Sequence, residues 1–101
     1  MSDLEEPDVV EFDMPLVMQA LGDRLRLRIV RALAQEGEKQ CGSFDLGVAK
    51  ATRSHHFKVL REAGITHTRV DGTSRFVSLR SDDLNQKFPG LLDAVLGDVR
   101  V

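Results

Sequence analysis

The chain of 101 residues has a single cysteine, only three prolines and no run of about twenty apolar residues. One cysteine cannot form an internal disulfide, which agrees with a reducing compartment. Without a long apolar run, no helix is expected to cross a bilayer. The first residues, MSDLEEPDVVEFD, also lack the basic and apolar regions of a secretory signal. We therefore expect a cytoplasmic protein with no membrane span.

Sequence motifs for catalysis and for metal binding are missing as well. We find no nucleophile elbow, no phosphate-binding P-loop, no HExxH and no supported pair of carboxylates. Cys41 is alone, whereas thiolate metal sites usually need two or more soft ligands. His55 and His56 are adjacent, and neighbours on a helix diverge by about 100°. The sequence therefore predicts no enzyme and no cofactor or metal site. The alternative is a nickel or zinc site built between two protomers or with the acidic N-terminus.

Length and composition predict one globular domain, of which 42% of the residues are hydrophobic and 30% are charged. The net charge is only −2, but it is unevenly distributed. Residues 50–80 hold seven basic and two acidic residues, which leaves seven basic and fourteen acidic residues elsewhere. A basic middle can face a polyanion. The alternative is that these Lys and Arg side chains merely solvate one side of a helix.

The first half of the chain is predicted to be helical after an acidic arm. Residues 1–13 carry six acids and no base, which predicts a flexible arm that precedes a domain over 14–101. A first helix follows from Pro15 to Gly22. A second helix has Asp23 as its N-cap and an apolar stripe of Leu25, Ile29, Ala32 and Leu33. The stretch GEKQCGSFDLG after Gly37 supports only a short helix over 43–46.

The second half of the chain predicts a basic helix and a β-hairpin. The segment ATRSHHFKVLREAG indicates a helix over 51–63 that ends with Gly64 in the C′ position. Two runs of period two, joined at Asp71-Gly72, predict a hairpin over 66–80 whose Val70 and Phe76 face inward. Ser81 begins a last helical region, which Phe88-Pro89-Gly90 interrupts before a final helix over 91–99.

Two helices joined by a tight turn, the second with small and basic residues on its outer face, suit a reader of duplex DNA. Small side chains let the helix approach base edges, and Lys and Arg neutralise phosphates. His55 falls on the outer face, while His56 falls beside the apolar stripe, where burial against a backbone group is expected. The predicted DNA-binding residues are Lys50, Ala51, Thr52, Arg53, Ser54, His55 and Lys58 of the helix, and Arg69 and Arg75 of the hairpin.

Several of these segments resemble one family. LGDRLRLRIVRAL, GVAKATRSHHFKVLREAGI, TRVDGTSRFVSL and FPGLLDAV are similar to winged helix-turn-helix repressors of the ArsR/SmtB type, over about residues 14–97. The resemblance implies a mainly α fold (α+β) with about five helices and a two-stranded wing. It also implies a transcriptional repressor that binds a palindromic operator in double-stranded DNA as a homodimer and is released by a metal or another signal.

The sequence departs from the sensor motifs of these repressors. One familiar sensor site contains Cys-x-Cys-Asp-Leu, whereas this chain has CGSFDL with one thiol. The other uses Asp and His residues in the last helix, and residues 81–101 contain no histidine. Arg53 replaces an apolar residue near the inner edge of the helix, so either its side chain extends toward DNA or the helix is rotated from this projection. An effector or a partner protein therefore stays open as the signal, and so does a winged helix that only binds another protein.

Both ends of the chain are more apolar than a small core requires, which independently predicts a dimer. The alternative is that the two terminal helices pack on each other within one protomer. The predicted dimer interface comprises Leu16, Val17, Leu21, Leu91, Leu92, Val95 and Leu96.

Overall fold

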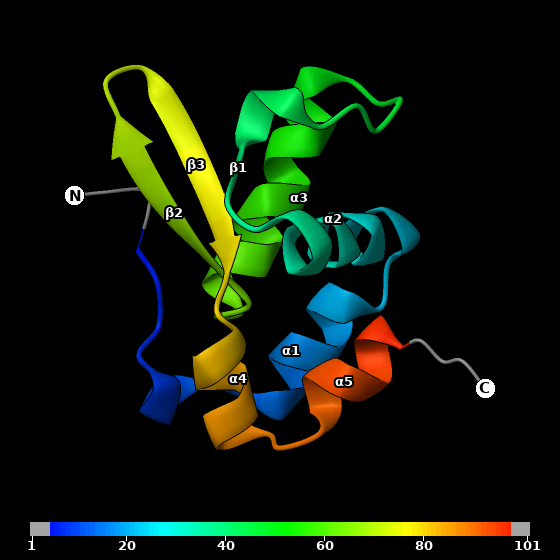
Figure 1. Cartoon of the computed structure of the whole chain (residues 1–101), viewed down its shortest axis with the longest axis vertical. Coiled ribbons are helices and arrows are strands. Elements are labelled where there is room, and N and C mark those ends of the chain that lie inside the picture. The colour runs from blue at the N-terminus through cyan, green and yellow to red at the C-terminus, as the bar shows by residue number, and fades with distance from the viewer. Residues whose placement is uncertain (1–4, 98–101) are drawn as a thin grey trace.

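The computed structural model describes residues 5–97, which form helices around one side of a small antiparallel sheet (Figure 1). The helices are α1 (Met14–Leu21), α2 (Arg24–Glu36), α3 (Lys50–Glu62), α4 (Ser81–Lys87) and α5 (Leu91–Leu96), with single 3-10 turns η1 (Val9–Glu11) and η2 (Cys41–Ser43). The strands are β1 (Lys39–Gln40), β2 (Thr66–Asp71) and β3 (Ser74–Leu79). This is the predicted winged helix-turn-helix arrangement, and none of these helices has the length and apolar character needed to span a membrane.

Local signals in the sequence set the limits of the helices. Asp23 caps α2, because its carboxylate accepts hydrogen bonds from the Leu25 and Arg26 amides, both at 3.0 Å. Helix α3 ends where Gly64 takes φ +88°, and the Ile65 amide then bonds the Leu60 carbonyl at 3.0 Å. This is the expected glycine-terminated end of a helix. The final helix begins after Gly90, as predicted, but it ends at Leu96, where Gly97 takes φ +35°, so the predicted extent to Val99 was too long.

The sheet has three strands in the order β1-β3-β2, so the prediction of a two-stranded wing was incomplete. Strand β1 contributes only Lys39 and Gln40, which pair with Val77 and Phe76 of β3. The short helix predicted over 43–46 was also wrong. The chain makes one 3-10 turn over Cys41–Ser43, and Phe44 then continues in an extended conformation. Phe44 and Leu46 are both buried, so they anchor the loop before α3 without forming a helix.

The hairpin turns at Gly72 and Thr73, next to the predicted Asp71-Gly72 junction. Phe76 was assigned to the wrong face, whereas Val70 lies on the same face as the buried Val77. Val70 pairs with Arg75, whereas Phe76 pairs with Arg69, so Val70 and Phe76 lie on opposite faces of the hairpin. Val77 is the buried residue, with 1% of its surface exposed, while Val70 is 51% exposed near the tip. The inward face therefore begins at the base of the hairpin and does not extend to its end.

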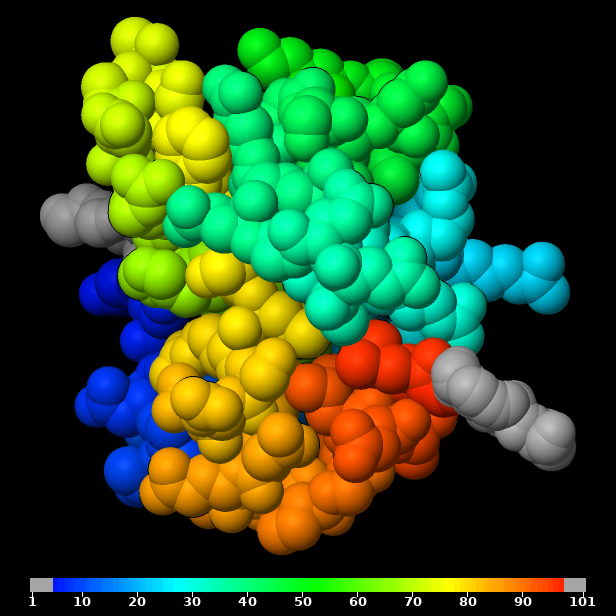
Figure 2. All heavy atoms as spheres, in the orientation of Figure 1, coloured from blue at the N-terminus to red at the C-terminus, as the bar shows by residue number. Residues whose placement is uncertain are grey.

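The wing tip and the beginning of α3 lie at the same end of the long axis, and α1, α4 and α5 lie at the other (Figure 1). In the space-filling view, the tip of the hairpin stands out from the body beside the segment that leads into α3 (Figure 2). The core between the two ends is formed by side chains of α1, α2, α3, β3, α4 and α5, with Ile29, Leu60 and Ile65 fully buried. This core separates the wing tip and the start of α3 from α1, α4 and α5.

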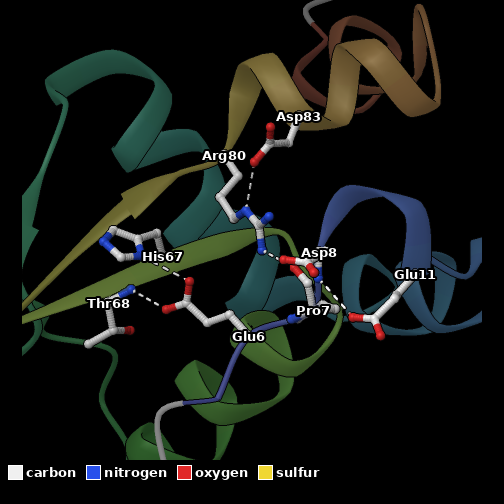
Figure 3. A network of polar contacts seen from close by, with 8 residues as sticks. All are labelled: Glu6, Pro7, Asp8, Glu11, His67, Thr68, Arg80 and Asp83. Atoms are coloured by element: carbon white, nitrogen blue, oxygen red, sulfur yellow. Dashed lines mark hydrogen bonds and ion pairs between the residues drawn. The ribbon is translucent and has the colours of Figure 1, made fainter.

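Residues 5–13 are packed against the domain and differ in this from the predicted flexible arm. Glu6 forms hydrogen bonds with His67 and Thr68 of β2, and Phe12 is 6% exposed (Figure 3). The Arg80 guanidinium donates to the Pro7 carbonyl at 2.8 Å. Composition alone does not reveal these contacts, because each depends on a residue at least fifty positions away. The described part of the acidic segment therefore belongs to the folded domain.

Candidate nucleic-acid interface

The outer face of α3 carries the side chains that the sequence assigned to DNA. Lys50, Ala51, Thr52, Ser54, His55 and Lys58 are all exposed. On the opposite face, His56, Phe57, Leu60 and Arg61 are buried. Phe57 meets Phe44 edge to face, with ring centroids 5.3 Å apart. The helix is thus held by its inner face, and its small and basic residues remain at the surface.

Arg53 holds a different position from the other predicted DNA-binding residues. Its side chain is half-buried, and Nη1 donates to the Phe44 carbonyl at 3.2 Å. This hydrogen bond ties the first turn of α3 to the extended segment before it. Its position near the inner edge of α3 agrees with the spacing in the sequence, but the guanidinium is directed to the protein backbone. Arg53 therefore stabilises the start of α3.

The two adjacent histidines have separate environments, as helical geometry predicts. His55 is exposed, whereas His56 is buried. The predicted backbone partner of His56 is replaced by a side chain, because Nδ1 lies 3.1 Å from Nη1 of Arg26. A guanidinium only donates hydrogen bonds, so Nδ1 is the acceptor in this contact. His56 thus contributes to the attachment of α3 to α2.

Arg26 connects three helices at this attachment. Besides its contact with His56, Nε donates to the Ala20 carbonyl at 2.6 Å, and Nη2 donates to the Gln19 carbonyl at 3.2 Å. These carbonyls lie in the last turn of α1, where a positive charge interacts favourably with the helix dipole. The alternation of Arg and Leu at the start of α2 contained this residue but gave no signal of its role. Arg26, which belongs to α2, thus holds both α1 and α3 against α2.

The two predicted arginines of the wing lie on opposite faces of the hairpin. Arg69 makes a two-pronged contact with Glu38, with Nε 3.2 Å from Oε2 and Nη2 2.9 Å from Oε1. This hydrogen bond lowers the pKa of the Glu38 carboxyl. The Arg69 guanidinium also lies 4.5 Å from the centroid of the Phe76 ring. Arg75 is exposed near the tip, on the other face. A phosphate therefore has to compete with Glu38 for Arg69.

Three exposed arginines of α2 lie outside the predicted set of DNA-binding residues. Arg24, Arg28 and Arg31 follow the spacing i, i+4 and i+7, which places them along one side of the helix. Arg28 reaches the loop before α3, because Nη2 lies 3.4 Å from the Asp45 carbonyl oxygen. The regular spacing of these arginines is visible in the sequence, where it indicated only a helix.

Histidine, cysteine and acidic side chains are the candidate metal ligands of the protein. Within residues 5–97, no three of them gather closely enough to hold an ion. The Cys41 thiol is half-buried, and burial raises its pKa, which disfavours the thiolate needed to bind a metal or react with an oxidant. The ring centroids of His55 and His56 are 6.2 Å apart. The described residues thus offer no preformed metal centre.

Comparison with known proteins identifies the family. The sequence model described as bacterial regulatory protein, arsR family, matches residues 23–68, from the cap of α2 into β2. The HTH-type transcriptional regulator YceK of Bacillus subtilis is 43% identical over 82 residues, which cover 78% of this chain and 82% of that protein. The chain belongs to the arsR family of bacterial regulatory proteins.

A second relative is also named as an HTH-type transcriptional regulator. An HTH-type transcriptional regulator of Methanocaldococcus jannaschii is 35% identical over 72 residues, which cover 69% of this chain and 81% of that protein. As a member of the arsR family, the chain is a DNA-binding transcriptional regulator and not an enzyme. The family assignment agrees with the exposed face of α3, which carries small and basic residues where a duplex reader needs them.

The residues predicted for the dimer interface differ in how deeply they are buried within the protomer. Val17, Leu21 and Leu92 are 0%, 7% and 5% exposed, so their assignment to the interface was wrong. Leu16 is 51% exposed and stays a candidate, while Leu91, Val95 and Leu96 are half-buried. Met14 and Met18 are exposed on α1 and were not included in the prediction. The exposed apolar side chains of α1 are therefore Met14, Leu16 and Met18, with Leu16 about half a turn around the helix from the two methionines.

Proposed function

We propose that this arsR-family protein is a transcriptional repressor that binds a palindromic operator as a homodimer. Helix α3 enters the major groove, and the wing contacts the adjacent phosphates. The observation that carries the proposal is the exposed surface of Lys50, Ala51, Thr52, Ser54, His55 and Lys58 along one face of α3. A groove-reading helix needs such a surface, with small residues for close approach and cations for phosphates.

The exposed apolar surface of α1 supports the homodimer. Met14, Leu16 and Met18 are 40%, 51% and 53% exposed, on a helix that lies at the end of the molecule away from the start of α3. A two-fold contact through this surface buries apolar groups that are otherwise in water. It also gives the dimer two recognition helices, which matches a palindrome with half-sites about one helical turn apart.

An electrophoretic mobility shift assay tests the proposal. The DNA is the promoter of the protein's own operon, at physiological salt and with excess competitor DNA. A repressor gives a retained complex that unlabelled promoter removes and competitor does not. Deletion of the gene should then raise transcription from this promoter. If the protein forms no complex with the promoter or with competitor DNA, the other candidate is favoured. That candidate is a winged helix that binds a partner protein as one subunit of a protein assembly.

Release by a signal is the remaining part of the proposal. A hollow of about 390 Å³ lies between α1 and α3, and His55 and Val59 of α3 line it together with Leu16 of α1. A small effector in this hollow would contact the recognition helix and the apolar surface of α1 at once. Direct metal sensing is the alternative, and equilibrium dialysis with nickel and zinc separates the two. Stoichiometric binding below micromolar concentration would establish a metal site between protomers or with the N-terminal acids.

A further inference from the structure

Residues 6–12, which we name the N-terminal strap, cross the joint between the recognition helix and the wing. Helix α3 ends at Glu62, and β2 begins at Thr66, so the two elements are joined by only three residues. The strap contacts both sides of this joint and also the end of β3. Figure 3 shows Glu6 directed to His67 and Thr68 of β2, and Arg80 directed to Pro7 of the strap.

The first contact fixes the strap to the wing. Oε1 of Glu6 lies 2.8 Å from Nδ1 of His67, and Oε2 accepts a hydrogen bond of 2.8 Å from the Thr68 amide. Strand β2 is at the edge of the sheet, so this carboxylate supplies an acceptor on the side that has no neighbouring strand. The Glu6 side chain is 17% exposed, which strengthens a charge-assisted hydrogen bond by excluding water.

The second contact fixes the strap to the end of the recognition helix. The Phe12 ring lies against Gly64, where an added Cβ would be 2.3 Å from Cε1 of the ring. Only glycine permits this approach, and Gly64 also has the positive φ that ends α3. Phe12 thus occupies a space that the end of the helix leaves open. Gly64 therefore both ends α3 and provides the surface against which the strap packs.

The third contact fixes the strap to the point where β3 leaves the wing. Arg80 follows β3, and its guanidinium donates to the Pro7 carbonyl at 2.8 Å and to Oδ2 of Asp83 at 3.0 Å. The guanidinium also lies 4.9 Å from the centroid of the Phe12 ring. Both strands of the hairpin are therefore tied to the strap at their bases, while the tip is left for other contacts.

We infer that the strap holds the wing at a fixed angle to α3, and that Glu6 is a positioning residue for DNA binding. The inference rests on the proposed function, because the angle matters only when α3 and the wing contact one duplex. A wing that is already placed need not be ordered when DNA binds, and ordering a segment weakens binding. Glu6 acts through His67 and Thr68 and does not itself contact DNA.

The test compares Glu6→Ala with the matched variant Glu5→Ala in the full chain. Both variants remove one carboxylate from the same segment, so they change the long-range attraction to DNA alike. Glu5 is exposed and has no hydrogen bond or ion pair within residues 5–97. Amide hydrogen exchange at Thr68 and the NMR signals of the His67 ring report the contact itself. Fluorescence anisotropy with promoter DNA reports binding.

The inference predicts faster exchange at Thr68 and shifted His67 signals in Glu6→Ala but not in Glu5→Ala. It also predicts promoter binding on the order of three- to tenfold weaker in Glu6→Ala than in Glu5→Ala. Unchanged exchange at Thr68, or equal or tighter binding by Glu6→Ala, would overturn it. Failure of wild-type protein and Glu5→Ala to bind any promoter DNA would instead refute the proposed function.

Discussion

Residues of the same type on α3 differ in their burial. His55 and His56 are neighbours in sequence, but the first is on the exposed surface and the second is packed on Arg26. Helical spacing was sufficient to predict this division. The partner of His56 was not predictable, because Arg26 lies thirty positions away and local sequence does not specify such a contact. Because the two side chains diverge on the helix, joint binding of one metal ion by the histidine pair was the less consistent hypothesis.

Lys58 provides the residue-scale test of phosphate contact. Lys58→Ala should weaken promoter binding and reduce the slope of log affinity against log salt by about one, since one phosphate contact is lost. Lys87→Ala is the control, because Lys87 is also exposed but belongs to α4, at the other end of the molecule. Anisotropy titrations over a range of salt concentrations measure both. A wild-type slope in Lys58→Ala would remove this lysine from the phosphate contacts.

Asp23 provides a test of capping at the residue scale. Its hydrogen bond from the Arg26 amide lowers the carboxyl pKa below the ordinary value of 3.8. The charged form therefore stabilises the fold above that value, and the stabilisation is lost as the pH falls through the lower pKa of the folded state. Asp23→Asn should show a smaller loss of stability below about pH 4, as measured by urea unfolding.

The same position is predicted to tolerate asparagine but not alanine at neutral pH. Asparagine keeps a side-chain acceptor for the α2 amides, whereas Asp23→Ala should cost about 0.5–2 kcal/mol of stability. Urea midpoints at neutral pH separate the two variants. Equal stability of Asp23→Ala and wild type would show that the carboxylate is not needed as a cap. An unchanged acid response in Asp23→Asn would refute the pH argument.

Among the elements, those with a regular period were predicted well. The apolar stripe and the terminal glycine indicated α3, and Asp71-Gly72 indicated the hairpin. Strand β1 was missed because two residues are too few to show a period, and its pairing with β3 depends on tertiary contacts. The inward face of the hairpin was misassigned for a related reason. Both faces of the hairpin carry apolar residues, and only the packed fold shows that the face of Val77, and not that of Phe76, is turned to the core.

Gly64 tests how α3 is ended and seated against the strap. Gly64→Ala should destabilise the fold more than Gly72→Ala, although both residues have positive φ, at +88° and +64°. The conformational strain of about 1–2 kcal/mol is common to both. Only the alanine at 64 also collides with Phe12, since nothing lies within 4 Å of an added Cβ at 72. Thermal unfolding compares them, and equal losses would contradict the close packing of Phe12.

At the scale of the whole molecule, the order of the predicted elements and the family resemblance predicted the architecture but not the assignment of apolar residues to core or interface. The apolar character of residues 14–21 indicated a buried helix without showing which side is covered by the protomer. The structure places Val17 and Leu21 in the core and leaves Leu16 exposed. The acidic segment was misjudged similarly, because its charges suggested disorder while Phe12 is seated in the core.

The exposed side of α1 gives the test of the proposed homodimer. Leu16→Glu should convert the dimer to a monomer, because a charge in an apolar interface loses its hydration without a partner. Ala51→Glu is the control, since it adds the same charge to an exposed helix position at the other end of the molecule. Sedimentation velocity at micromolar concentration measures the mass. A monomeric wild type, or a dimer that survives Leu16→Glu, would remove this surface from the interface.

The central claim is that the exposed face of α3 reads a DNA sequence in a two-fold arrangement. Selection of duplexes from a randomised pool by the purified protein, followed by sequencing, tests it most directly. The account predicts an inverted repeat with half-sites about 10 base pairs apart from centre to centre. It also predicts an altered preference within each half-site in the Thr52→Ala and Ser54→Ala variants. A bound pool with the same sequence composition as the starting pool would contradict it.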